Sequence, residues 1–102
     1  MKETSEKYIE RKLVQGIQAR GGLCIKLICD QMTGLPDRLC LLPHELIYFV
    51  EVKSTGKKPR KIQKAVHAKL KELGFKVIVI DSMLDLDLLF NSIDVYEREQ
   101  LT

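Results

Sequence analysis

Two carboxylates, one near the start and one near the end of a predicted hairpin segment, are the side chains in this sequence best placed to do chemistry. The segment of residues 34–58, "GLPDRLCLLPHELIYFVEVKSTGKK", carries strand-forming residues on both sides of a short turn. If Pro43–Glu45 forms a three-residue turn, the strand register places Asp37 opposite Glu51 on one face of the sheet. Directly opposed residues have β-carbons about 5 Å apart, so the two negative charges would repel each other.

A divalent cation between the two carboxylates would turn this repulsion into attraction. Carboxylate oxygens suit Mg²⁺ and Mn²⁺, and a bound metal of this kind activates water and polarises a phosphate. Lys53 lies one step beyond Glu51 on the same face, where its ammonium group could orient the water or stabilise developing charge. The pattern therefore favours a divalent cation held by these two carboxylates.

The first predicted helix offers a third acid. Residues 5–20 repeat apolar side chains every four positions, and both Glu10 and Glu6 fall within the arc that this apolar stripe covers. A glutamate on a core-facing stripe needs a partner. The partner could be the same metal, reached directly or through water, or it could be a lysine at the rim of the core.

The second predicted helix places Gln63 and His67 one turn apart at the edge of its apolar stripe. Gln63 could donate a hydrogen bond to a phosphate. We expect His67 to be a surface residue, and His44 to be solvated in the hairpin turn.

These side chains need an α/β scaffold to position them. The hydrophobic pattern, the glycine stops and the turn residues predict seven elements in the order α-β-β-β-α-β-α. They are a helix over 5–20, a strand over 23–29, strands over 38–42 and 46–53, a helix over 60–73, a strand over 76–81 and a helix over 83–91. We expect a mixed sheet flanked by helices in a single domain of residues 1–102, with residues 92–102 as a frayed tail.

The composition agrees with one globular domain. The chain has 102 residues, of which 45% are hydrophobic and 30% charged. No apolar run approaches the ~20 residues that span a bilayer, and the first residues are too polar for a secretory signal, so we expect no membrane association and a cytoplasmic location. The three cysteines are not spaced as a metal or disulfide pair, and we expect free buried thiols.

Positive charge is concentrated after the predicted hairpin. The net charge is +3, but the segment "KSTGKKPRKIQK" contains six cations and no acid. A local basic patch of this kind is typical of phosphate binding, although a solvated loop would have the same composition. The residues that we expect to contact nucleic acid are Lys57, Lys58, Arg60 and Lys61.

The spacing of "PD" at Pro36–Asp37 and "EVK" at Glu51–Lys53 resembles the PD-(D/E)xK nuclease superfamily. The stretches "IERKLVQGIQARGGLCIKL", "TGLPDRLCLLP" and "FVEVKSTGKKPRKIQKAVHAKLKELGFKVIVID" resemble one branch of it, the VRR-NUC domain (virus-type replication-repair nuclease), over roughly residues 6–81. Because we expect no further domain, the chain is similar to the stand-alone phage and bacterial members, which would place it in the cytoplasm of a bacterium or of a phage-infected cell. The hairpin turn "PHEL" departs from relatives that more often carry glycine there.

This resemblance implies a restriction-endonuclease-like fold and a Mg²⁺- or Mn²⁺-dependent endonuclease. Stand-alone members of this type look like homodimers that cut branched DNA such as four-way junctions. The positions that match the family's functional residues are Glu10 (with Glu6 less well placed), Asp37, Glu51, Lys53 and Gln63, and the backbone carbonyl of Val52 would be a further metal ligand.

Two other functions fit the same residues. A nucleic-acid-binding module without catalysis would use the basic segment and leave the carboxylates structural. A nuclease-fold subunit of a larger complex would use the acid pair only to bind an ion. The presence of the whole set of matching residues favours the enzyme.

Overall fold

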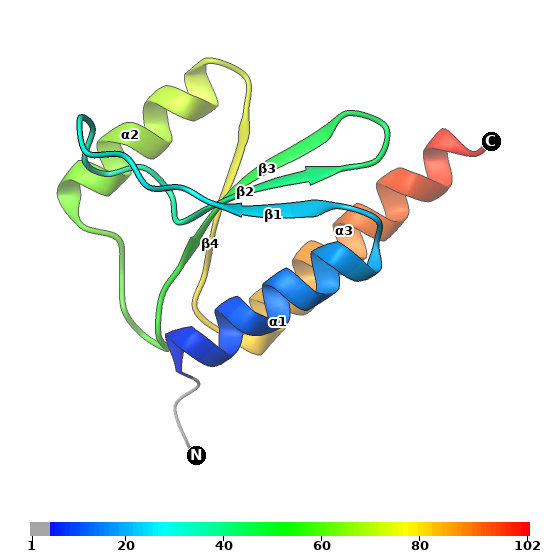
Figure 1. Ribbon diagram of the computed structural model, residues 1–102, viewed down its shortest axis with the longest axis horizontal. Coiled ribbons are helices and arrows are strands. Elements are labelled where there is room, and N and C mark those ends of the chain that lie inside the picture. The colour runs from blue at the N-terminus through cyan, green and yellow to red at the C-terminus, as the bar shows by residue number, and fades with distance from the viewer. Residues whose placement is uncertain (1–4) are drawn as a thin grey trace.

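A computed structural model describes residues 5–102 as a four-stranded sheet with helices on both faces. The elements in chain order are α1 (Glu6–Ala19), β1 (Leu23–Lys26), β2 (Arg38–Leu42), β3 (Leu46–Val52), α2 (Lys61–Glu72), β4 (Lys76–Ile80) and α3 (Met83–Gln100). Figure 1 shows α1 and α3 together on one side of the strands and α2 on the other. This arrangement confirms the predicted fold class.

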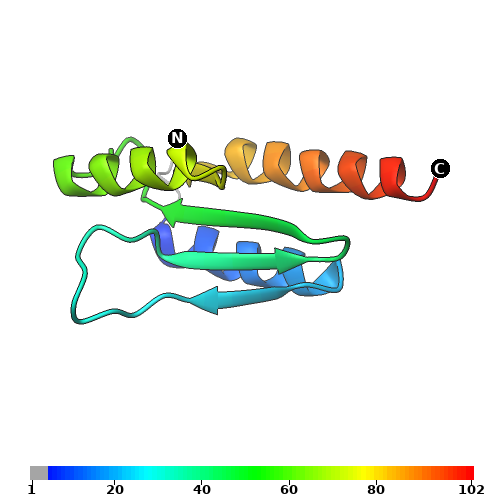
Figure 2. The ribbon, with the colours of Figure 1, turned by 90° about the horizontal axis from the view of Figure 1, so that it is seen from above.

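The sheet is mixed, and its strands follow one another in chain order. β1, β2 and β3 pair antiparallel, whereas β4 runs parallel to β3 because α2 carries the chain back across the sheet. Figure 2 shows β1 (cyan) at the outer edge, with β2 and β3 beside it in order. Pro43–Glu45 form the turn of the β2–β3 hairpin, and Leu42 pairs with Leu46, as the sequence predicts.

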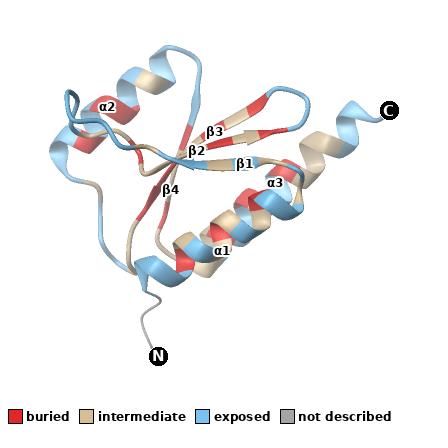
Figure 3. Ribbon diagram, in the orientation of Figure 1, coloured by how far each residue is buried: buried red, intermediate tan, exposed pale blue. Residues whose placement is uncertain are grey.

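The two faces of the β2–β3 hairpin have different partners because side chains alternate along a strand. Cys40, Tyr48, Val50 and Val52 point toward α1 and α3 and form the main core with the buried side chains of those helices. α1 contributes Ile9, Leu13 and Ile17, and α3 contributes Leu86, Leu89 and Ile93. Figure 3 shows these buried residues along the strands and on the helix sides that face the sheet. The opposite face, which carries Glu51, lies under α2.

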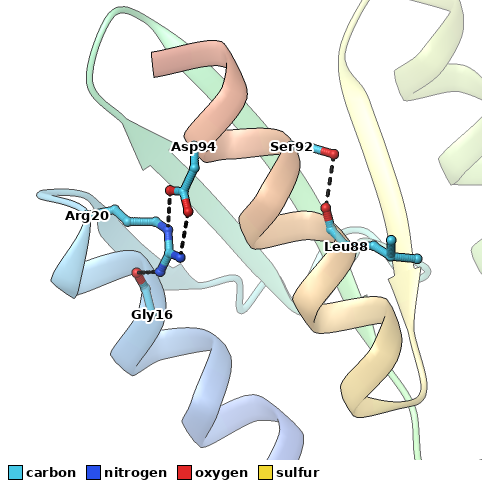
Figure 4. Close-up of polar contacts among 5 residues, drawn as sticks. All are labelled: Gly16, Arg20, Leu88, Ser92 and Asp94. Carbon is cyan, nitrogen blue, oxygen red and sulfur yellow. Dashed lines mark hydrogen bonds and ion pairs between the residues drawn. The ribbon is translucent and has the colours of Figure 1, made fainter. Parts of the chain in front are cut away.

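The last helix is longer than the sequence pattern predicts. We expected it to end near residue 91 and the following residues to fray, but α3 continues to Gln100. Arg20 holds this second half, donating from Nε and Nη2 to Asp94 at 2.8 and 3.1 Å and from Nη1 to the Gly16 carbonyl (Figure 4). These hydrogen bonds lower the pKa of Asp94.

Two further contacts explain why the tail is ordered. Ile93 is buried in the core, and the hydroxyl of Tyr96 donates to the His44 carbonyl at 2.7 Å. His44 and Glu45 both adopt φ of 62°, a left-handed conformation uncommon outside glycine, and α3 braces this turn. His44 is solvent-exposed, as expected.

Two other expectations need correction. β1 ends at Lys26 and is therefore shorter than the strand predicted over residues 23–29. Residues 27–37 form a loop. The thiols are free, but only Cys40 is buried, since Cys24 is half-buried opposite Cys40 and Cys29 is exposed. Within residues 5–102 no helix is long and apolar enough to cross a membrane.

Candidate active site

Asp37 and Glu51 meet at the end of the β2–β3 hairpin. The strand pairing ends at Arg38 and Val50, and the same register continued by one residue brings Asp37 level with Glu51, as predicted. The negative charge of Asp37 is close enough to raise the pKa of Glu51. Asp37 is fixed by the backbone of the neighbouring strand, because its Oδ2 accepts a hydrogen bond from the Val52 amide at 2.7 Å. One oxygen of Asp37 therefore has a structural role, since it fixes the carboxylate at the end of the sheet.

The loop before β2 delivers Asp37 by packing tightly against α2. Gly34 adopts φ of +89°, and a β-carbon at this position would lie 2.9 Å from the Ile62 carbonyl and 3.0 Å from Val66. Only glycine fits both the backbone conformation and the space. The "GLPD" segment thus holds the carboxylate between α2 and the end of the sheet.

Glu51 is almost completely buried, with 1% of its surface exposed. Its Oε2 accepts a hydrogen bond from Gln63 Nε2 at 3.1 Å and lies 3.2 Å from Lys53 Nζ. Burial and the nearby charge of Asp37 raise the pKa of Glu51 to about 7, although Lys53 opposes the shift. The protein thus holds a carboxylate where its negative charge is costly unless a cation compensates it.

The second oxygen of Glu51 has no hydrogen-bond partner in the part of the chain that the structure describes. Oε1 is buried and lies 3.6 Å from His67 Nε2, which also lacks a partner within residues 5–102. His67 is 6% exposed, so the expectation of a surface histidine was wrong. Burial, together with Lys71 and Lys53, lowers the pKa of His67 and favours the neutral ring.

Gln63 links the start of α2 to the site. Its Oε1 accepts from the Arg60 amide at 2.7 Å, which fixes the orientation of the side-chain amide and points Nε2 at Glu51. The sequence suggested that Gln63 could donate to a phosphate; in the structure its side-chain amide donates to Glu51. Gln63 and His67 reach the same carboxylate because they are four residues apart on one helix face.

Glu10 does not join this pair. It lies on α1, behind the opposite face of the sheet, and its Oε2 accepts from Arg38 Nε at 2.8 Å. Arg38 points toward α1 because it follows Asp37 by one residue in the strand. The ion pair with Arg38 resembles the predicted alternative in which a cation at the rim of the core is the partner of Glu10. A contact of Glu10 with a metal, directly or through water, stays a prediction. Glu6 is solvent-exposed.

The four cations predicted to bind nucleic acid are solvent-exposed where α2 begins. Lys57 and Lys58 lie in the loop that follows β3, and Arg60 and Lys61 are at the helix start. Because Gln63 in the first turn of α2 contacts Glu51, this basic segment is adjacent to the carboxylates in the fold.

The acid pair and its surroundings fit a divalent cation. Two carboxylates supply hard oxygen ligands, and one buried oxygen of Glu51 has no partner within residues 5–102. In the same range, no cluster of three His, Cys, Asp or Glu side chains is arranged to hold a metal. A metal would therefore depend on these two carboxylates together with backbone oxygen and water.

Comparison with known proteins identifies the family of this chain. No family model matches the sequence. The chain is 43% identical over 82 residues to a protein named "Putative nuclease p44" from Acyrthosiphon pisum secondary endosymbiont phage 1, and the match spans 80% of this chain and 88% of that protein. A solved structure titled "VRR_NUC domain" superposes with a TM-score of 0.81 at 31% identity, covering 86% of this chain and 97% of the other. Sequence and fold together show that the chain belongs to the VRR-NUC family.

Proposed function

We propose that this protein is a Mg²⁺- or Mn²⁺-dependent endonuclease that hydrolyses phosphodiester bonds in branched DNA. The observation that carries the proposal is Glu51, a buried carboxylate beside Asp37 that has one oxygen without a hydrogen-bond partner in the described chain. Placing a half-buried carboxylate beside a buried one destabilises the fold, and a cation site gives that arrangement a function. The relatives support nucleic-acid cleavage as the chemistry.

Asp37 Oδ1, Glu51 Oε1 and the Val52 carbonyl are the atoms that would hold the metal. When bound, such an ion lowers the pKa of a coordinated water and neutralises charge on the phosphate. Asp37 is ready for this role because its Oδ2 is already fixed on the Val52 amide. Glu10 would act from a distance, by holding Arg38 next to Asp37.

Lys53 is the residue that would act on the reacting atoms. Its ammonium group lies 3.2 Å from Glu51 Oε2, so it is held at the carboxylates. From there it would orient the attacking water or stabilise the extra negative charge of the transition state. Gln63 would keep Glu51 in place, because its amide is itself fixed by Arg60.

The basic segment would hold the DNA backbone next to the site. Lys57, Lys58, Arg60 and Lys61 are exposed and lie between β3 and α2. Since aromatic side chains are absent from this segment, base stacking would contribute little and phosphate contacts would dominate.

Selectivity for branched DNA would follow from the assembly. One protomer measures only 41 × 37 × 20 Å and offers one acid pair. A four-way junction has two strands to cut in symmetric positions, and a two-fold symmetric dimer would place one site on each.

A cleavage assay separates this proposal from its alternatives. Four-way junction, nicked, forked and linear DNA of equal length would be incubated with the protein in Mg²⁺, Mn²⁺ or EDTA. We expect metal-dependent cleavage that is fastest on the junction. Binding to all substrates without cleavage in any metal would favour a binding module, whereas equal cleavage of linear duplex would remove the branched-DNA assignment.

A further inference from the structure

We infer that His67 is a positioning residue, whose Nε2–H group faces Glu51 Oε1 and fixes that oxygen for cation binding. The inference rests on the proposed function and extends its site to a residue on α2. The two atoms lie 3.6 Å apart, and neither has a hydrogen-bond partner within residues 5–102. Both are buried, and buried polar atoms normally have partners.

The identity of the two atoms determines where the imidazole proton lies. Glu51 Oε1 can only accept when the carboxylate is ionised, so a bare Nε2 lone pair would place two acceptors against each other. A proton on Nε2 pairs a donor with an acceptor instead. The burial that lowers the pKa of His67 keeps the ring neutral, so that the other nitrogen, Nδ1, carries no proton.

The contacts of Glu51 then account for most of its lone pairs. A carboxylate offers about four acceptor positions, two on each oxygen. Gln63 and Lys53 occupy Oε2, and His67 would occupy one position on Oε1. One acceptor position on Oε1 is then left for a cation. Oε1 is the Glu51 oxygen that has no hydrogen-bond partner within residues 5–102. Partners that orient a ligating carboxylate commonly change metal affinity or activity by about 10–100-fold when they are replaced.

Substitution by amides distinguishes a donor at this position from a filler of space. In His67→Gln the amide nitrogen falls near the position of Nε2, whereas in His67→Asn it falls near that of Nδ1. His67→Leu keeps an apolar side chain of similar size without a donor. Circular dichroism and thermal melting of each metal-free variant would establish that it folds before any binding is compared.

Mn²⁺ affinity, measured by calorimetry without DNA, is the first readout. We expect His67→Leu and His67→Asn to weaken Mn²⁺ binding by about 10–100-fold, while His67→Gln stays within a few-fold of the original protein. Unchanged affinity in the Leu variant would overturn the inference. Equal weakening in the Gln and Leu variants would also overturn it, because the donor would then not be what matters.

The nitrogen NMR spectrum of the imidazoles gives a second readout on metal-free protein, recorded at about pH 8.5 so that Glu51 is ionised despite its raised pKa. The chain has two histidines, so the exposed His44 is an internal control. We expect His67 to carry its proton on Nε2 and its Nε2 resonance to shift in Glu51→Gln, with His44 unchanged. A proton on Nδ1 would overturn the inference. If the original protein bound no Mn²⁺, the proposed function would fail, but this spectrum would still decide how His67 faces Glu51.

Discussion

Glu51 is held in conditions that oppose its ionisation, and this has a measurable cost. Its pKa is raised from 4.5 to about 7, so the folded protein keeps the proton in a pH range where the unfolded chain has released it. Stability must therefore fall as the pH rises from about 4.5 to about 7 and level off above, by about 1.4 kcal/mol for each unit of pKa difference. Asp37, Lys53 and His67 are the titratable groups that face it.

Urea unfolding in EDTA across this pH range tests the effect. Glu51→Gln should remove the fall, so that the difference in unfolding free energy between the variant and the original protein widens as the pH rises. The comparison is needed because His67, with a lowered pKa, destabilises the fold in the opposite direction, as the pH falls below its usual 6.5. If the unfolding free energies of the two proteins changed in parallel with pH, ionisation of Glu51 would not be the cause of the fall in stability.

Substitution of Lys53 distinguishes a role in catalysis from a role in DNA binding. Lys53→Met keeps the apolar stem and removes the charge, and we expect the single-turnover rate of junction cleavage to fall by roughly 10²-fold or more. The assay belongs at about pH 8, because Lys53 also lowers the pKa of Glu51 and its removal would otherwise weaken metal binding indirectly. DNA affinity in Ca²⁺ is the control. A weaker affinity with an unchanged rate would make Lys53 a phosphate contact.

At the scale of elements, the second half of α3 is part of the core. Ile93 is 2% exposed, so Ile93→Ala should lower the free energy of unfolding by about 2–4 kcal/mol. Ile28, which is 81% exposed in the loop after β1, provides a matched control whose replacement should change stability by less than about 0.5 kcal/mol. If both substitutions had equally small effects on urea unfolding, residues 92–102 would be a frayed tail, as the sequence pattern predicts.

The sequence predicts the hairpin well because local rules decide it. The turn length and the alternation of side chains fix the register, and this brings Asp37 to Glu51 without knowledge of any helix. The last helix was predicted too short because its hydrophobic pattern weakens after residue 91. Its second half is stabilised by Arg20 and by the core, whose residues are distant in the chain.

Sequence periodicity does not predict on which face of the sheet each helix packs. Glu10 lies on a core-facing stripe, as predicted, but the stripe faces Arg38 on the side of the sheet opposite Glu51. His67 was predicted to lie on the surface because it falls at the edge of the apolar stripe of its helix. Its spacing of four residues from Gln63 was the available signal that both residues could share one target.

At the scale of the whole molecule, the basic segment should determine how DNA binding responds to salt. Replacing Lys57, Lys58, Arg60 and Lys61 by Ala should flatten the log–log dependence of affinity on salt by about one unit for each phosphate that is no longer bound. A matched control replaces four exposed cations elsewhere, namely Lys26, Lys69, Lys76 and Arg98. DNA affinity would be measured in Ca²⁺ over a range of salt concentrations. If the slope flattened more in the control variant than in the variant of the basic segment, the DNA-binding surface would lie elsewhere.

The most direct test of the account is single-turnover cleavage of a four-way junction by Asp37→Asn in saturating Mg²⁺. This variant keeps a side-chain oxygen that can accept from the Val52 amide, so the fold should persist while one of the two paired negative charges is removed. The account predicts loss of cleavage with DNA affinity in Ca²⁺ retained and with metal-free stability equal to or above that of the original protein. Cleavage at the original rate by a folded Asp37→Asn variant would contradict a metal-dependent site at Asp37 and Glu51.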